Sequence, residues 1–188
     1  AVEGAQLPPP LDTKFWSFAS RPTVTGNGTV YFAGGTRDTQ NGSTTARGLF
    51  DGNGQAIAYS GDLLPNLPAI LDFGGSAIAF GFRFSGNGTN WIAEALMETT
   101  GTGLTSSNDE AVVINGVGLM LDGVLLREDN PVPASIGGLP GETWSSVDQT
   151  VINEAGEYLI TGNTADGGTT TDEFVILTGQ IVLREGDF

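Results

Sequence analysis

Three stretches of the sequence decide the fold, and they read TARGLFDGNG at Thr45–Gly54, NDEAVVING at Asn108–Gly116 and TDEFVILTG at Thr171–Gly179. Their first residues are 63 positions apart in both steps. In each stretch an apolar run leads into a turn that contains glycine, and a second apolar run follows. This pattern is typical of a β-hairpin. The sequence therefore contains an internal repeat of about 63 residues that occurs three times.

A second hairpin is predicted upstream of each stretch. Its turn begins with a short, oxygen-bearing side chain and ends with glycine three positions later, in the pairs Thr25 and Gly28, Ser85 and Gly88, and Asn153 and Gly156. We expect the first side chain to accept a backbone N–H and close an Asx- or Ser/Thr-type turn. The glycine can adopt positive φ without a Cβ penalty. Each repeat therefore holds two hairpins, or about four short strands.

The predicted fold class is all-β, because four antiparallel strands per unit are the blade of a β-propeller. We place the repeats at approximately 15–68, 69–140 and 141–188, within one β-repeat domain over 15–188. They form either propeller-like blades or an open array. Three blades do not comfortably close a ring, since propellers usually have about four or more. Either the chain is part of a longer one, or copies of it join to complete the architecture.

Two parts of the chain leave alternatives open. Val124–Asp129 resembles Ile181–Asp187 as well as Leu119–Leu121 does, so the second repeat holds an extra strand or the third is truncated. Residues 1–14, with a run of three prolines at 8–10, form an N-terminal extension ahead of the repeats. This extension is interpreted as a linker, an extended polyproline arm, or a strand lent to a neighbouring subunit for assembly.

The composition excludes several classes of partner and chemistry. The chain has 22 acidic residues against 7 Lys and Arg, and a net charge of −15, which repels nucleic acid and anionic lipid. It has no histidine and no cysteine, so serine–histidine–acid triads, histidine-ligated zinc and thiol nucleophiles are excluded for this chain alone. No apolar run approaches the roughly 18 residues of a membrane span, so no membrane insertion is expected.

The acidic residues suggest calcium as the only cofactor worth weighing. Asp51 and Asn53 lie in a loop rich in oxygen ligands, and Asp109 and Glu110 form a second acidic cluster. A calcium site needs about six to eight oxygens, and neither cluster has the full EF-hand spacing. Because Asp-Gly and Asn-Gly are also common hairpin-turn residues, turn chemistry is the favoured interpretation, with no cofactor.

Paired carboxylates could serve a glycosidase, which needs no histidine. Glu110, Glu173, Asp109 and Asp172 are placed alike in two repeats. Catalytic pairs are rarely copied from one blade to the next, whereas residues at the start of a strand are. We therefore predict a protein that is not an enzyme, with a carboxylate-pair hydrolase as the alternative.

The aromatic residues raise the alternative of a glycan-binding module, since exposed rings stack on sugars. The candidates lie inside apolar strands or close to the repeat turns, where core packing is the favoured interpretation. They are Trp16, Trp91, Trp144, Tyr31, Tyr59 and Tyr158. The polar loops between the hairpins are the other candidate binding surface.

The Asn-x-x-Gly turn and the strand after it resemble the tandem NxxGxxxxxAF repeat proteins over most of residues 15–188. Asn153 and Gly156 match the turn fully, and the other two turns have a hydroxyl residue in place of Asn. The Ala-Phe element corresponds to Tyr31–Ala33 and Trp91–Ala93. The resemblance implies a bacterial exported protein of the choice-of-anchor type with propeller-like blades, and it brings no catalytic residues.

These observations favour an extracellular or cell-surface bacterial protein with a structural role. The expected partners are other copies of the same chain, which would form a surface, matrix or filament. The alternative is a secreted module that binds a glycan or another surface ligand.

Overall fold

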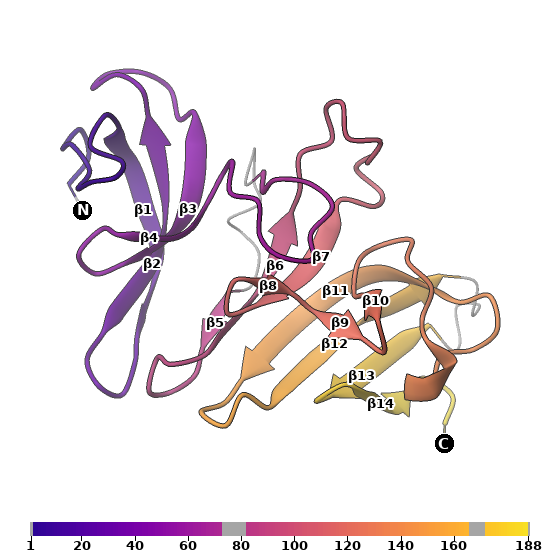
Figure 1. Cartoon of the computed structure of the whole chain (residues 1–188). Helices are drawn as coiled ribbons and strands as arrows, with labels where there is room; N and C mark the ends of the chain where they lie inside the picture. Colours follow the sequence, from indigo (N-terminus) through magenta and orange to yellow (C-terminus); the bar gives the residue numbers. More distant parts are fainter. Residues whose placement is uncertain (1, 73–81, 166–171, 188) are drawn as a thin grey trace.

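The computed structural model describes residues 2–72, 82–165 and 172–187, and it confirms the all-β fold (Figure 1). The described strands form three antiparallel sheets of four strands each and one sheet of two strands. A short 3₁₀ helix, η2 (Ala134–Ile136), precedes the last sheet. Within the described ranges no helix is long and apolar enough to cross a membrane.

The three four-stranded sheets follow one another along the chain, and we call them blades 1, 2 and 3. Blade 1 consists of β1 (Phe15–Val24), β2 (Val30–Arg37), β3 (Ala46–Asp51) and β4 (Ala56–Tyr59). Blade 2 consists of β5 (Arg83–Phe84), β6 (Trp91–Leu96), β7 (Glu110–Ile114) and β8 (Val117–Gly118). Blade 3 consists of β11 (Thr143–Ile152), β12 (Tyr158–Ala165), β13 (Glu173–Leu177) and β14 (Gln180–Arg184). In every blade the strands lie in sequence order, so each repeat is two consecutive hairpins, as predicted.

The first turn of every blade closes through its final glycine. The glycine N–H donates to the carbonyl oxygen three positions earlier, at 2.9 Å for Gly28 and Gly88 and 3.1 Å for Gly156. The φ angles of these glycines are 82°, 75° and 81°. A side chain with a Cβ would be strained at this angle, which is why the sequence places glycine there.

The first residue of these turns acts differently in the three blades. Asn153 Oδ1 accepts two backbone N–H groups at 2.9 and 3.0 Å, and Ser85 Oγ accepts one at 3.0 Å. Thr25 does not act as the sequence suggested, because its Oγ1 donates to Asn27 Oδ1 at 2.6 Å. Asn27 itself accepts the backbone N–H of Thr29 at 3.0 Å. In this turn the side-chain oxygen of Asn27 therefore accepts the backbone N–H, in place of the Thr25 hydroxyl.

These turns also connect neighbouring blades. Asn27 Nδ2 of the first turn donates to the carbonyl of Asn87 in the second at 2.9 Å. Asn90, just after the second turn, donates through Nδ2 to the carbonyls of Asn153 and Glu154 in the third, both at 3.1 Å. The turns of blades 2 and 3 lie close together in Figure 1. Hydrogen bonds between residues about one repeat apart therefore join the first turn of each blade to that of its neighbour.

Each blade has two faces, which we call front (toward the following blade) and back (toward the preceding blade). The front of blade 1 contributes Ala33 and Leu49 to one apolar cluster, and the back of blade 2 contributes Phe82 and Ala93. A larger cluster joins the front of blade 2 to the back of blade 3, and it includes Ile92, Val112, Trp144, Ile152, Ile160, Phe174 and Ile176. The core of the molecule is therefore a series of junctions between sheets.

The N-terminal extension lies on the back of blade 1. Leu7 is 3% exposed and packs with Trp16, Phe32 and Phe50. The backbone N–H of Trp16 donates to the carbonyl of Ala5 at 2.8 Å. Residues 2–14 thus form the cover of the first sheet, a placement that differs from a flexible linker.

The linkers between the blades cover the next sheet in the same way. Leu67 and Leu71 pack on the back of blade 2, and Val132 and Ile136 pack on the back of blade 3. The N-terminal extension therefore has the same position relative to blade 1 that the packed segments between blades have relative to blades 2 and 3. The physical repeat consists of a covering segment followed by its sheet.

The second repeat contains the extra strand that the sequence left open. After β8 the chain forms a hairpin of β9 (Met120–Leu121) and β10 (Val124–Leu125), and it then returns to the edge of blade 2. There Ala111 pairs with Arg127, as Phe174 pairs with Arg184 in blade 3. Arg127 is thus the counterpart of Arg184, and the hairpin is an insertion into the fourth strand.

Candidate functional site

The junctions between blades repeat the same contact at the end of the first strand. In the three blades the last residue of the first strand pairs with the first residue of the second, as Val24 with Val30, Phe84 with Trp91, and Ile152 with Tyr158. Phe84 stacks on the ring of Tyr31 of blade 1, with 3.7 Å between centroids and 10° between planes. Ile152 lies in the same cluster as Ile92 of blade 2, and Ile92 is the counterpart of Tyr31.

The front of blade 3 has the same pattern, but no described part of the chain packs against it as a further sheet. The central pairs of the three sheets are Ala33 with Leu49, Glu94 with Val112, and Thr161 with Val175. Leu49 and Val112 are 5% and 0% exposed, whereas Val175 is only half-buried. On the same face, Leu177 of β13 is 49% exposed, and Leu183 of β14, the strand partner of Val175, is 45% exposed.

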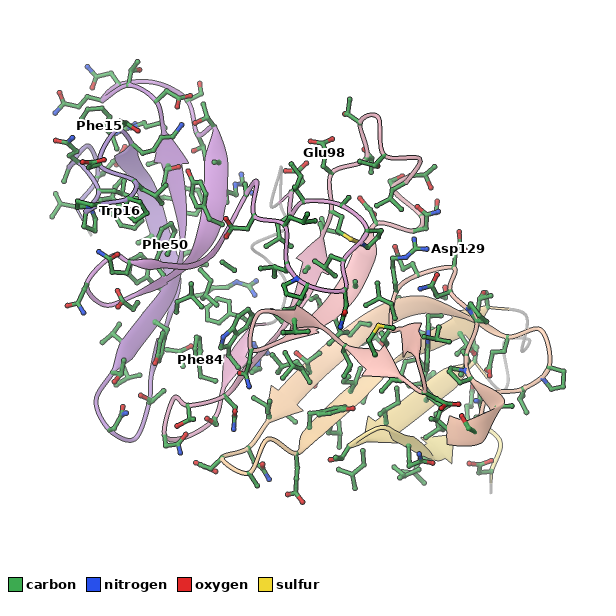
Figure 2. The ribbon with its side chains drawn as sticks, in the orientation of Figure 1. Phe15, Trp16, Phe50, Phe84, Glu98 and Asp129 are labelled. Atoms are coloured by element: carbon green, nitrogen blue, oxygen red, sulfur yellow. The ribbon has the colours of Figure 1, made fainter. Side chains whose placement is uncertain are left out.

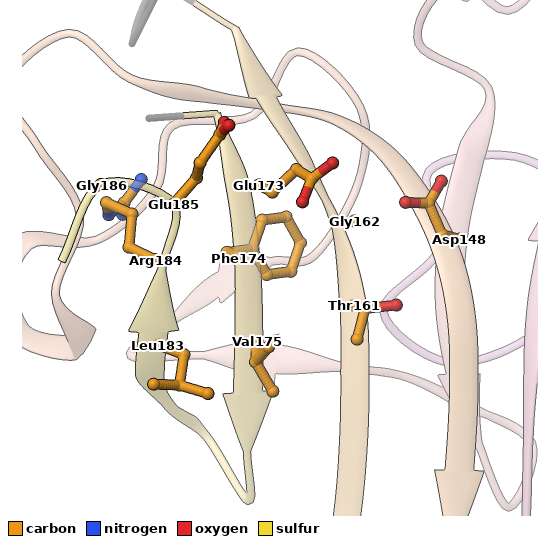
Figure 3. Close-up of a pocket in the computed structure, with 10 residues that line it drawn as sticks. All are labelled: Asp148, Thr161, Gly162, Glu173, Phe174, Val175, Leu183, Arg184, Glu185 and Gly186. Atoms are coloured by element: carbon orange, nitrogen blue, oxygen red, sulfur yellow. The ribbon is translucent and has the colours of Figure 1, made fainter. Parts of the chain in front are cut away.

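A hollow of about 450 Å³ lies on this open face (Figure 3). Val175 and Leu183 line its apolar part, and three carboxylates surround one end of it. The carboxylates come from three strands or strand ends of blade 3, and they belong to Asp148, Glu173 and Glu185. We call these three residues the acidic rim.

Among the residues that line the hollow, Arg184 is the one cation, and it forms a buried ion pair with Glu142. Arg184 Nη1 contacts Glu142 Oε1, and Arg184 Nη2 donates to Glu142 Oε2 at 3.1 Å. Burial acts to raise the pKa of Glu142, but hydrogen bonds from Thr164, from the Leu139 N–H and from Arg184 together lower it. Because the described lining of the hollow has three carboxylates and this one cation, the acidic rim gives one end of the hollow a negative charge.

Two members of the acidic rim have counterparts inside the molecule. Glu128 N–H donates to the carbonyl of Glu110 at 3.1 Å, and Glu185 N–H donates to the carbonyl of Glu173 at 2.9 Å. The first acid pair lies at the junction of blades 2 and 3, where burial, followed by the charges of Glu128 and Glu94, raises the pKa of Glu110 to about 7. Glu110 Oε1 is buried and forms no hydrogen bond to a described residue. The second pair lies on the open face.

The calcium candidates lie in two different blades. Asp51 Oδ1 accepts the backbone N–H groups of Asn53 and Gln55, both at 2.9 Å, and so closes the turn between β3 and β4. Asp109 and Glu110 lie at the start of β7 in blade 2. Among the residues that the structure describes, no group of three or more acidic side chains could hold a metal ion. Asp51 and Asn53 thus have a role in turn formation.

The acids considered for hydrolysis are not brought together across the repeats. Glu110 is on the front of blade 2 and faces blade 3, whereas Glu173 is on the opposite side of blade 3. Asp172, next to Glu173, uses its carbonyl to accept the backbone N–H of Thr164 at 2.8 Å. The two repeats therefore place their acids in separate environments.

The six candidate Trp and Tyr side chains are buried or half-buried in the described structure, as Trp16 beside Phe50 in Figure 2 illustrates. Trp16 and Trp144 are 4% and 2% exposed and pack edge-on against phenylalanines of their own blades. Trp91 is half-buried between two apolar clusters. Tyr31, Tyr59 and Tyr158 are half-buried as well.

Sequence reasoning did not identify the acidic rim or the open apolar face. A signal was present, because Arg127-Glu128 and Arg184-Glu185 follow similar apolar runs and recur at the same place in two repeats. That signal reveals the paired glutamates. Which of the two pairs is covered depends on the neighbouring sheet.

Comparison with known proteins adds a family. The model of a family of unknown function, DUF7453, matches residues 1–187. Searches of curated proteins and of solved structures found no match. Because the family match spans nearly all of the sequence, the chain belongs to the DUF7453 family.

Proposed function

We propose that this protein is a non-enzymatic structural subunit that acts outside a bacterial cell, as part of a surface, matrix or filament, by joining its sheets to those of other copies. One observation carries the proposal. The front of blade 3 is open, although the equivalent faces of blades 1 and 2 are covered by the next blade.

The open face favours association for an energetic reason. Removing apolar surface from water stabilises a contact by roughly 25 cal/mol per Å². Leu177 and Leu183, on the same face as Val175, are 49% and 45% exposed and give this face an apolar surface. Apolar patches with a polar rim often mark sites of protein interaction. The acidic rim keeps such a face soluble until a partner covers it.

The composition supports a place outside the cell. The chain has no cysteine that would depend on a reducing compartment, and a net charge of −15 that favours solubility. The resemblance of its turns to exported bacterial repeat proteins points the same way. These arguments bear only on where the protein acts. The open face of blade 3 is the argument for its structural role.

Self-association is the property to measure first. We expect the mean mass in sedimentation and light scattering to rise with protein concentration, because apolar faces become covered. A particle that stays at 19.4 kDa at every concentration would contradict the proposal. If that monomer bound a glycan saturably, the protein would instead be a binding module, and glycan turnover would indicate a hydrolase.

A further inference from the structure

We propose that the partner on the open face is a second copy of this chain, docked head to tail, so that the front of blade 3 in one copy receives the back of blade 1 in the next. The inference rests on the proposed function and deepens it, because it names the two surfaces that meet. Two internal junctions provide the template.

The first step of the argument is that the chain already makes this junction twice. At the first, Tyr31 on the front of blade 1 stacks on Phe84. At the second, Ile92 on the front of blade 2 shares a cluster with Ile152. Leu159 has the corresponding position in blade 3, since Leu159 pairs with Leu177 as Ile92 pairs with Ile114. By analogy with Tyr31 and Ile92, Leu159 is therefore the position that would contact the last residue of a first strand in a neighbouring blade.

The second step is that blade 1 offers that residue. Val24 ends β1 as Phe84 ends β5 and Ile152 ends β11. Ile152 is 8% exposed because blade 2 covers it, whereas Val24 is 67% exposed. Its strand partner Val30 is 37% exposed. The described residues thus leave one front and one first strand uncovered, and these are the two halves of one junction.

The third step concerns the acidic rim. Val147 in β11 packs against the cluster of the second junction, and its backbone lies beside the Glu110 carboxyl and acts to lower its pKa. Val147 pairs with Gly162 in β12 as Ala19 pairs with Gly34 in β2, so Ala19 is its counterpart. Ala19 is exposed. In the docked pair, Glu173 of one copy therefore meets the backbone of Ala19 in the next.

The fourth step is that the N-terminal segment does not obstruct docking. It covers the back of blade 1 with Leu7, as the linker covers the back of blade 2 with Leu67 and Leu71. Blade 1 still meets blade 2 beside that linker. A second copy therefore finds the same combination of sheet and cover that the internal junctions use.

A contact between two different surfaces repeats from copy to copy. It closes into a ring if the rotation closes, and otherwise it continues as a filament. Two copies together have a number of sheets within the range of about four to eight in closed propellers. The mass of the assembly distinguishes these two forms, and both use the same junction.

Engineered cysteines give a direct test, because the chain has none of its own. Val24→Cys and Leu159→Cys are prepared as separate proteins, mixed and oxidised. We expect a mixed disulfide dimer at a level at least about tenfold above that from either protein alone, as a head-to-tail contact requires. Val117→Cys, which is 41% exposed on β8, serves as the matched control and is expected to give no dimer with Val24→Cys above background.

The outcomes separate the two proposals. If the native chain stays monomeric, the structural function itself fails. If it assembles but Leu159→Cys cross-links with itself as readily as with Val24→Cys, the sheets pair face to face and the head-to-tail inference is wrong. A second variant tests the apolar contact: Val24→Asp weakens self-association by at least about tenfold, since it removes one apolar contact and buries a charge against Leu159. Equal weakening by Val117→Asp would also overturn the inference.

Discussion

Blades 2 and 3 carry the same pair of glutamates in two different environments. Glu110 and Glu128 share a backbone hydrogen bond at the junction of blades 2 and 3, and Glu173 and Glu185 share the same bond on the open face. In the covered pair, burial and neighbouring carboxylates raise the pKa of Glu110 to about 7. The comparison teaches that the neighbouring sheet sets the chemistry of the pair, while the local backbone is the same.

The largest expected difference between the two faces comes from a charge placed at their central valines. Val112→Asp should lower the free energy of unfolding by more than about 4 kcal/mol, because it buries an unpaired charge at a 0% exposed position. Val175→Asp in blade 3 is the matched control, with an expected loss below about 1 kcal/mol because water reaches this face. Urea unfolding of both variants measures the difference. Equal losses would show that the two faces are equally buried.

The next effect compares the ends of the first strands. Ile152→Ala should cost about 2–4 kcal/mol, because it removes a side chain from the cluster at the second junction and leaves a cavity. Val24→Ala should change stability by less than about 0.5 kcal/mol, because Val24 is 67% exposed. Thermal unfolding at a concentration where the chain is monomeric gives both values. A cost at Val24 comparable to that at Ile152 would mean that β1 is already covered.

The smallest effect is the pH dependence of the acid pairs. The pKa of Glu110 is raised from 4.5 to about 7 in the folded protein, so folding becomes less favourable as the pH rises through this window. Glu94, Glu128 and Asp109 all act in this direction on the same carboxyl. Glu110→Gln should therefore stabilise the protein above pH 7, by about 1–2 kcal/mol after allowance for the water that reaches this half-buried group.

Denaturation at pH 5 and pH 8 checks this prediction, with Glu173→Gln as the control. The gain from Glu110→Gln should be present at pH 8 and nearly absent at pH 5, where the native carboxyl is largely protonated already. Glu173→Gln should leave the monomer's stability unchanged at both pH values. A gain at pH 5 as large as that at pH 8 would assign the effect to packing instead of charge.

The sequence contained enough to predict the blades. Glycines such as Gly28 and Gly156 are required by positive φ, and hydrophobic runs 63 residues apart define equivalent strands. Aromatic-containing runs precede these turns in the sequence, and two of them, Phe15–Phe18 and Trp144–Val147, lie in β1 and β11. Of the corresponding Phe80–Phe82, residues 80 and 81 lie outside the described residues, and β5 begins at Arg83. Local chemistry thus determined most of the strands.

Long-range packing could not be predicted in the same way. Leu7 and Leu67 look like ordinary residues of a linker, and only the folded chain shows that each packs on the sheet that follows it. The sequence around the strand partners Thr161 and Val175 is compatible with a face that another sheet covers or with a face that is open to solvent. The extent of the inserted β9–β10 hairpin likewise depends on Arg127 returning to pair with Ala111. These features depend on contacts between distant segments, which propensity and periodicity do not encode.

The covering segments have a consequence for how such a chain can evolve. Because the cover precedes its sheet, a duplicated stretch that includes both would insert one more blade with its own apolar lining. The number of uncovered faces would stay the same. A covering segment together with its sheet is therefore the unit that such a chain can gain or lose without exposing a new apolar face.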